Sequence, residues 1–238
     1  PQGGSAWVRE PYAGGGCGTS TMTDGQVLSA FRQALDRDAQ LLAHCNGDRA
    51  AEQYLTLLAQ AEREAGKKLC RPVMIHAQLL GLDQLERVKA LGVIPSFFVA
   101  HVYHWGEIHV KNFGLDRAGR ISPAGSALAR VIPFTFHQDS PVIPPDMLET
   151  IWCACVRKTK TGRVLGAEER IPVEAALRAV TQNAALQYGL ENELGTLRPG
   201  KRADFVLLSG DPLRTPPEEL KKLQVERTIR CGRTIWSR

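Results

Sequence analysis

The sequence has no apolar run that approaches the roughly 18 residues a membrane-spanning helix needs, although the chain has 238 residues. Its first residues, PQGGSAWVREPY, also lack the charged segment and apolar core of a secretory signal. Neither a membrane protein nor a signal-bearing start is indicated. We therefore expect no membrane partner.

Cysteine is present without any recognisable pattern. The six thiols are irregularly spaced and include no CxxC pair: Cys17, Cys45, Cys70, Cys153, Cys155 and Cys231. Such spacing argues against a zinc ribbon and against a disulfide framework. We expect reduced, mostly buried thiols, which favours a cytoplasmic location.

Positive charge exceeds negative charge only slightly, with 30 Lys+Arg against 25 Asp+Glu and a net charge of +5. The basic residues are scattered, apart from short clusters such as residues 157–160, where Arg157 and Lys158 are expected on a solvated helix surface. A nucleic-acid binder would gather them on one stripe with aromatics, so no nucleic-acid partner is expected. Hydrophobic residues at 43% and charged residues at 23% are typical of a globular enzyme.

Short apolar runs alternate with helical patterns along the first 140 residues. The runs cover residues 40–44, 71–76, 92–101 and 131–139, and each ends in a polar side chain. Helical spacing of apolar residues falls at 26–38, 49–63, 82–91 and 124–130. This alternation is typical of parallel βα units. Four units with polar strand ends predict an α/β fold, half of a (β/α)₈ TIM-type barrel.

The pattern changes after residue 140. Residues 146–157 and 172–188 have helical spacing, and residues 203–208 form an apolar run. Residues 225–236 contain two β-like runs around a Cys-Gly-Arg turn, which indicates a hairpin. We therefore expect a small β domain at the end of the chain.

Four of the polar residues lie where the predicted strands end: His44, His76, His101 and Asp139. Side chains at the carboxyl ends of parallel barrel strands point into one shallow cup. A catalytic metal ion needs three or more His, Asp or Glu ligands that converge on one point. A metal site is favoured, but hydrogen-bonded histidines at strand ends, and Asp139 as the N-cap of the next helix, are the structural alternatives.

Other histidines lie near these positions. His101 and His104 are three residues apart in AHVYHWGE, where substrate contact and a packed loop are both open. His137 precedes Asp139 by two residues, so in an extended strand end both side chains would face the same side. His137 is therefore expected to help shape a pocket.

Several stretches of the chain carry a resemblance to one family. They are HCNGDRA (44–50), IHAQ (75–78), HQDSPV (137–142), ALRAVTQNAA (176–185), LGTLRPGKRADFVLL (194–208) and GGSAWVREPY (3–12). In this order and spacing the chain resembles the amidohydrolase superfamily, in its YtcJ-like branch, amidohydrolase family 3. The match runs from end to end and corresponds to the C-terminal portion of that family.

The resemblance implies barrel strands five to eight in residues 1–190 and part of a small β-sandwich domain in residues 191–238. It implies metal ligands at His44, His76 and Asp139, with Asp139 also the catalytic general base. His101, His104 and His137 would contact the substrate. The implied cofactor is a divalent metal, one or two ions with zinc first, and the implied reaction is hydrolysis of a carbon–nitrogen bond in a small-molecule, non-peptide amide.

One departure from the family is severe. Its His-x-His pair of strand one and its ligand of strand four would precede Pro1, and no His-x-His occurs in the sequence. We therefore expect a fragment of a protein about twice as long. The open sheet edges of a half-barrel could pair with the edges of another copy, so a homo-oligomer is one of the expected states. The alternatives are a catalytically inactive half-barrel that serves binding or assembly, and a deaminase of the same superfamily.

Overall fold

A computed structural model describes residues 3–238 and contains a parallel sheet of four strands. The strands β1 (Leu42–Cys45), β2 (Val73–His76), β3 (Ile94–Phe97) and β4 (Thr135–Phe136) pair in sequence order. A parallel pair requires a crossover connection, and helices supply it here. The predicted α/β class with a parallel sheet is confirmed.

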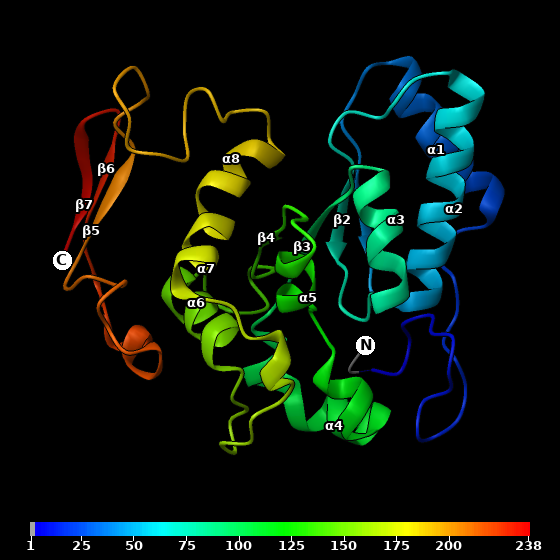
Figure 1. The fold of residues 1–238 in the computed structure, drawn as a ribbon, viewed down its shortest axis with the longest axis horizontal. Coiled ribbons are helices and arrows are strands. Elements are labelled where there is room, and N and C mark those ends of the chain that lie inside the picture. The colour runs from blue at the N-terminus through cyan, green and yellow to red at the C-terminus, as the bar shows by residue number, and fades with distance from the viewer. Residues whose placement is uncertain (1–2) are drawn as a thin grey trace.

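Helices surround this sheet (Figure 1). They are α1 (Asp24–Asp36), α2 (Asp48–Ala65), α3 (Leu85–Ala90), α4 (His101–Gly119), α5 (Ala124–Ala129), α6 (Met147–Val156), α7 (Val173–Val180) and α8 (Gln182–Gln187). Three short 3₁₀ segments join them: η1 (Leu82–Gln84), η2 (Ala167–Glu169) and η3 (Pro217–Lys222). In Figure 1, α1 and α2 lie beyond the end of the sheet formed by β1 and β2, α6 to α8 lie beyond the end formed by β4, and α4 lies beyond the carboxyl edge of the strands.

Local sequence explains where the first helices begin and end. The Thr23 side chain accepts from the backbone N–H of Gln26, whose side chain accepts from the N–H of Thr23, a capping box that starts α1. Helix α2 ends at Gly66, whose φ of 62° suits glycine. Its buried face, which includes Tyr54, Leu55 and Leu58, packs into the main core.

The third and fourth predicted strands are shorter than expected. β3 ends at Phe97, and His101 is the first residue of the 19-residue helix α4 rather than the end of a strand. Apolar residues are spread around α4, so its sequence lacks the one-sided pattern that reveals a surface helix. β4 keeps only Thr135–Phe136, and the predicted helix 172–188 divides at Thr181, where φ and ψ are −125° and −82°.

The prediction that Arg157 lies on a solvated surface is wrong, because its side chain is fully buried. Arg157 follows α6 in a left-handed conformation, with φ 52°. Its guanidinium donates to backbone carbonyls of Leu165, Gly119 and Ile121 at 2.8 to 3.0 Å. Gly119 ends α4, Ile121 follows it closely, and Leu165 lies in the segment after α6, so one buried cation binds carbonyls from two separate parts of the chain.

The C-terminal part is an antiparallel sheet of β5 (Phe205–Leu208), β6 (Val225–Arg230) and β7 (Arg233–Ser237). The hairpin between β6 and β7 confirms the predicted turn at Cys231–Gly232. This sheet lies apart from the parallel sheet in Figure 1, and η3 contacts α6 between them. Leu220 of η3 is fully buried, and the Lys221 ammonium lies 4.2 Å from the centre of the Trp152 ring.

The structure also tests the expectations for the cysteines and for membrane-spanning helices. All six cysteines are free, as expected of reduced thiols. Cys45, Cys153 and Cys155 are buried and Cys17 is half-buried, whereas Cys70 and Cys231 are exposed, so the expectation of mostly buried thiols holds for only three of the six. Among residues 3–238, no helix combines the length and the apolar character needed to cross a membrane.

A carboxylate of α2 yields a first prediction, on pH. Partial burial raises the pKa of Glu52, but hydrogen bonds from Arg87, Gln84 and Arg9 outweigh it and lower the pKa to about 2. Because the folded pKa lies below the unfolded one, this carboxylate stabilises the fold above pH 4.5, and the stabilisation is lost as the pH falls toward 2. Solvent screening limits it to less than about 1 kcal/mol.

Urea unfolding of wild type and Glu52→Gln across pH 7 to 3 measures this effect. The variant is expected to be less stable at pH 7, with a difference that shrinks as the pH falls. The exposed Glu218→Gln is the control and should show little difference at any pH. A Glu52→Gln difference that grows on acidification would contradict the expectation.

Candidate metal centre

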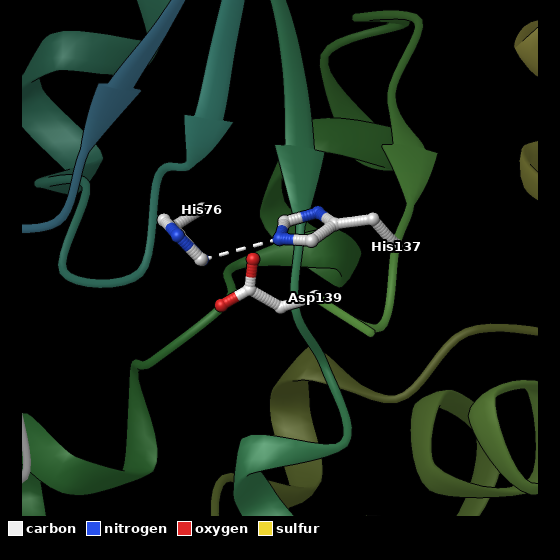
Figure 2. Close-up of side chains that lie close together, drawn as sticks. All are labelled: His76, His137 and Asp139. Atoms are coloured by element: carbon white, nitrogen blue, oxygen red, sulfur yellow. Dashed lines mark hydrogen bonds between the residues drawn. The ribbon is translucent and has the colours of Figure 1, made fainter. Parts of the chain in front are cut away.

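Three side chains converge at the carboxyl edge of the parallel sheet (Figure 2). His76 is the last residue of β2, His137 follows β4 directly, and Asp139 lies two residues further on. One ligand atom from each lies within 4.8 Å of the others. His76 is buried, His137 is half-buried and Asp139 is exposed, so the group is anchored in the core and open on one side.

Hydrogen bonds hold the two imidazoles. His137 Nε2 and His76 Nδ1 are 3.1 Å apart, the contact drawn as a dashed line in Figure 2. On its other side, His137 Nδ1 shares a 3.0 Å hydrogen bond with the hydroxyl of Ser96, which lies in β3. A partner on the far nitrogen is what fixes the ring and tautomer of a metal-binding histidine. Ser96 can therefore orient His137 with Nε2 toward His76.

Burial keeps both imidazoles neutral. Burial, followed by the neighbouring His137 and His44, lowers the pKa of His76 to about 3. Burial likewise lowers the pKa of His137 to about 4, although the Asp139 carboxylate opposes this. Neutral imidazole is the form that coordinates metals, so both rings keep a lone pair at neutral pH.

The backbone at the site adopts unusual conformations. His76, Ala77 and Asp139 have φ values of 72°, 46° and 53°, in the left-handed region that residues with side chains seldom adopt. Each such residue costs on the order of 1 kcal/mol or more, and such residues cluster at functional sites. The turns redirect the chain at the ends of β2 and β4, where the ligand side chains leave the sheet.

His44, at the end of β1, lies beside this group. Its ring centre is 4.8 Å from that of His76, and its Nε2 is 3.1 Å from the amide nitrogen of Asn46. The ring is exposed, and His44 does not share the 4.8 Å grouping of the other three residues. Its assignment as a ligand stays a prediction.

His101 and His104, two of the three histidines of α4, occupy different surroundings. The His101 ring packs 4.6 Å from Phe98, and Phe98 in turn lies 5.4 Å from His137. His104 instead binds the Glu149 carboxylate of α6 through Nε2 at 2.8 Å. His101 is therefore connected to the site through one aromatic ring, whereas His104 joins two helices.

The capping alternative for Asp139 is wrong. Helix α6 begins at Met147, and its N-cap is Asp146, whose side chain accepts from the backbone N–H of Glu149 at 3.0 Å. Asp139 therefore has no role in starting that helix.

Sequence reasoning missed Ser96 and Phe98. Ser96 is a buried hydroxyl in an otherwise apolar strand, a signal that the sequence does contain. Phe98 shows no such signal, because it differs from core phenylalanines only in packing beside His76, His137 and His101.

The donor set suits a divalent metal. Two imidazole nitrogens and a carboxylate oxygen are the ligand types of open catalytic zinc sites, and several other divalent ions accept them. The exposed side of Asp139 leaves room for water or substrate. The residues present thus fit a metal, with His76, His137 and Asp139 as the group that can hold it.

Comparison with known proteins is consistent with this geometry. The Bacillus subtilis protein YtcJ, named as an amidohydrolase, is 26% identical over 244 residues, which cover 99% of this chain and 45% of YtcJ. N-substituted formamide deformylase of Arthrobacter pascens is 30% identical over 158 residues, 66% of this chain and 29% of that enzyme. A 5-methylthioadenosine/S-adenosylhomocysteine deaminase of Syntrophomonas wolfei is 28% identical over 141 residues, 56% of this chain and 32% of that protein.

A solved structure shows the same fold. An uncharacterised metal-dependent hydrolase from Pyrococcus furiosus matches with a TM-score of 0.74 and 27% identity, over 90% of this chain and 43% of that one. The chain spans less than half the length of these relatives. Residues 1–236 match the Amidohydrolase family, and the chain therefore belongs to that family.

Proposed function

We propose that this protein is a divalent-metal hydrolase that cleaves a carbon–nitrogen bond in a small-molecule, non-peptide amide. The observation that carries the proposal is the convergence of His76, His137 and Asp139 at the carboxyl ends of β2 and β4. In barrels built of parallel strands, this is the edge where chemistry takes place. Relatives that are named as amidohydrolase and deformylase support the reaction class.

In this proposal each residue has a stated role. His44, His76 and Asp139 are ligands, and the geometry adds His137 to them. A divalent ion, with zinc first, supplies Lewis acidity that polarises the substrate carbonyl and makes water more acidic. Asp139 is the general base, since its exposed carboxylate can take a proton from water and return it to the leaving nitrogen. His101 and His104 would contact the substrate, with His101 the nearer through Phe98.

The fold proposal is that residues 1–190 form strands five to eight of a (β/α)₈ barrel and residues 191–238 form part of a β-sandwich. Four parallel strands in sequence order support the first part. For the second, Val206 of β5 and Trp236 of β7 lie on either side of Thr228 and so share one face of the sheet, and both are exposed, as expected of a face that another sheet would cover. A cytoplasmic location and a homo-oligomer stay predictions.

Metal content tests the proposed function. Plasma mass spectrometry of the purified chain should find about one divalent ion per chain, and a His76→Ala, Asp139→Ala double variant should lose it because two of three close ligands are gone. His104→Ala is a matched control, since it removes an imidazole that is bound to Glu149. An ion that persists in the double variant, or none in wild type after zinc is supplied, would contradict the proposal.

A deaminase is the second candidate, because a deaminase is among the relatives and the ligand types suit both reactions. Product analysis separates the two: an amidohydrolase releases an amine and a carboxylic acid from an amide, whereas a deaminase releases ammonia from an aminated ring. If the purified chain binds no metal, the alternative of a catalytically inactive module that serves binding or assembly is favoured.

A further inference from the structure

A row of rings runs along one face of α4 from the edge of the candidate metal centre. Phe98 precedes the helix, and His101, Trp105, His109 and Phe113 follow at intervals of four residues, the spacing that stacks side chains on one helix face. His101 lies 4.6 Å from both Phe98 and Trp105, and His109 stacks on Phe113 at 6.0 Å. The proposed roles of the metal ligands make no use of His109.

His101 and His109 form a buried pair. His101 Nδ1 and His109 Nε2 are 3.0 Å apart, so one of the two nitrogens donates a hydrogen bond to the other. His109 is fully buried, and its Nδ1 is enclosed with no hydrogen-bond partner among residues 3–238. His101 is also buried, with 5% of its surface exposed, and its Nε2 is the other outer nitrogen of the pair. The pair therefore has one sealed end, at His109 Nδ1, and a second outer nitrogen, His101 Nε2.

Burial holds both rings in the neutral form. Burial, followed by the neighbouring His109, lowers the pKa of His101 to about 2, and burial lowers the pKa of His109 to about 3. A neutral pair has two possible arrangements. If His101 donates, His109 keeps an N–H with no partner at the sealed end. If His109 donates, the sealed end keeps only a lone pair.

Two effects favour His109 as the donor. A buried N–H without an acceptor is rarer in proteins than a buried acceptor without a donor, because the N–H gives up its hydrogen bond to water and gains no other. In addition, His101 is the first residue of α4, where the positive end of the helix dipole favours a lone pair on the nearer nitrogen, Nδ1. With Nδ1 accepting from His109, the proton of His101 must sit on Nε2.

We infer that His101 presents an Nε2–H to the substrate as a hydrogen-bond donor for its carbonyl oxygen, and that His109 is the positioning residue that sets this tautomer. The inference rests on the proposed function, because it deepens the same site. Phe98 touches the rings of His101, His76 and His137, so the donor lies one ring away from the candidate metal centre. A neutral donor can polarise a carbonyl without transferring its proton.

The tautomer can be measured directly on the 238-residue chain without metal or substrate. Long-range ¹H–¹⁵N spectra of histidine-labelled protein distinguish a protonated from an unprotonated ring nitrogen, and loss of one signal set in His101→Gln identifies His101. We expect a protonated Nε2 and an unprotonated Nδ1. A protonated Nδ1 on His101 would overturn the inference, and the wild-type spectrum alone decides this.

Two variants test whether His109 is responsible. His109→Gln keeps an amide N–H that can donate to His101 Nδ1, whereas His109→Phe keeps a stacked ring and removes the donor. The Gln variant should retain the wild-type tautomer, and the Phe variant should show a mixture of both. Equal mixtures in both variants, or no change in either, would show that His109 does not set the tautomer.

Titration with N-methylformamide tests the donor role. The His101 Nε2–H signal is expected to shift with amide concentration. A His101 signal that stays unchanged at the highest soluble concentration would overturn contact with the substrate carbonyl. Because metal content is measured separately, failure of the proposed function and failure of this inference give different results.

Discussion

Replacing Arg157 with methionine is expected to lower the free energy of unfolding by about 3–5 kcal/mol, comparable to breaking a buried ion pair. Methionine fills much of the volume but donates no hydrogen bond. The carbonyls of Leu165, Gly119 and Ile121 would then be left without the partner they have now. Each unsatisfied buried carbonyl costs about 1–3 kcal/mol, and partial access of water would reduce the sum.

Urea denaturation followed by circular dichroism measures the Arg157→Met effect. Arg178→Met is the control, because the Arg178 side chain is 60% exposed and pairs with Glu174 one turn away. Such a pair contributes about 0.5 kcal/mol or less. Arg157→Lys should fall between wild type and methionine, since lysine keeps the charge without the planar fork. A loss below about 1 kcal/mol for Arg157→Met would show that the loops do not depend on this guanidinium.

Replacing Asp139 with asparagine is expected to lower kcat for an N-substituted amide by about 10²–10⁴-fold in the whole protein, the usual contribution of a general base. Asparagine has nearly the same size and keeps one oxygen as a possible ligand. It cannot accept a proton at neutral pH, so the expected loss lies in turnover. Asp139 is suited to this role because its carboxylate is exposed beside the buried His76 and half-buried His137.

The metal content of the Asp139→Asn protein must be measured in the same sample. Retained metal with reduced kcat would support the general-base role, whereas loss of metal would assign Asp139 to binding alone. Asp146→Asn is a matched control, because Asp146 caps α6 and asparagine caps helices about as well. Unchanged kcat in Asp139→Asn with metal retained would refute the assignment.

Much of the fold could be predicted from local pattern. The helices before β1, β2 and β3 have apolar residues on one face, and the strands are short apolar runs that end in polar residues. Those features depend only on residues a few positions apart, which is why periodicity reveals them. Helix α4 was not predicted, because its apolar residues are spread around the helix and give no one-sided pattern. It also contains Gly114, whose φ of 75° is not helical.

The candidate site was partly visible in the sequence. His76 and Asp139 were identified from strand ends, and His137 was placed on the same side as Asp139 but was assigned to the pocket. That His137 Nε2 lies 3.1 Å from His76 Nδ1 depends on the register of strands 61 residues apart, with Ser96 between them. No local spacing contains this information.

The sequence by itself determined the order of the βα units, the chemical types of the ligands and the family resemblance, because each is carried by residues that are close together in the chain. Only the tertiary structure decided which ligands meet, which tautomer His109 favours in His101, and why Arg157 is buried. These depend on the packing of distant segments, where burial turns a surface-type residue such as arginine into the partner of backbone carbonyls from separate turns.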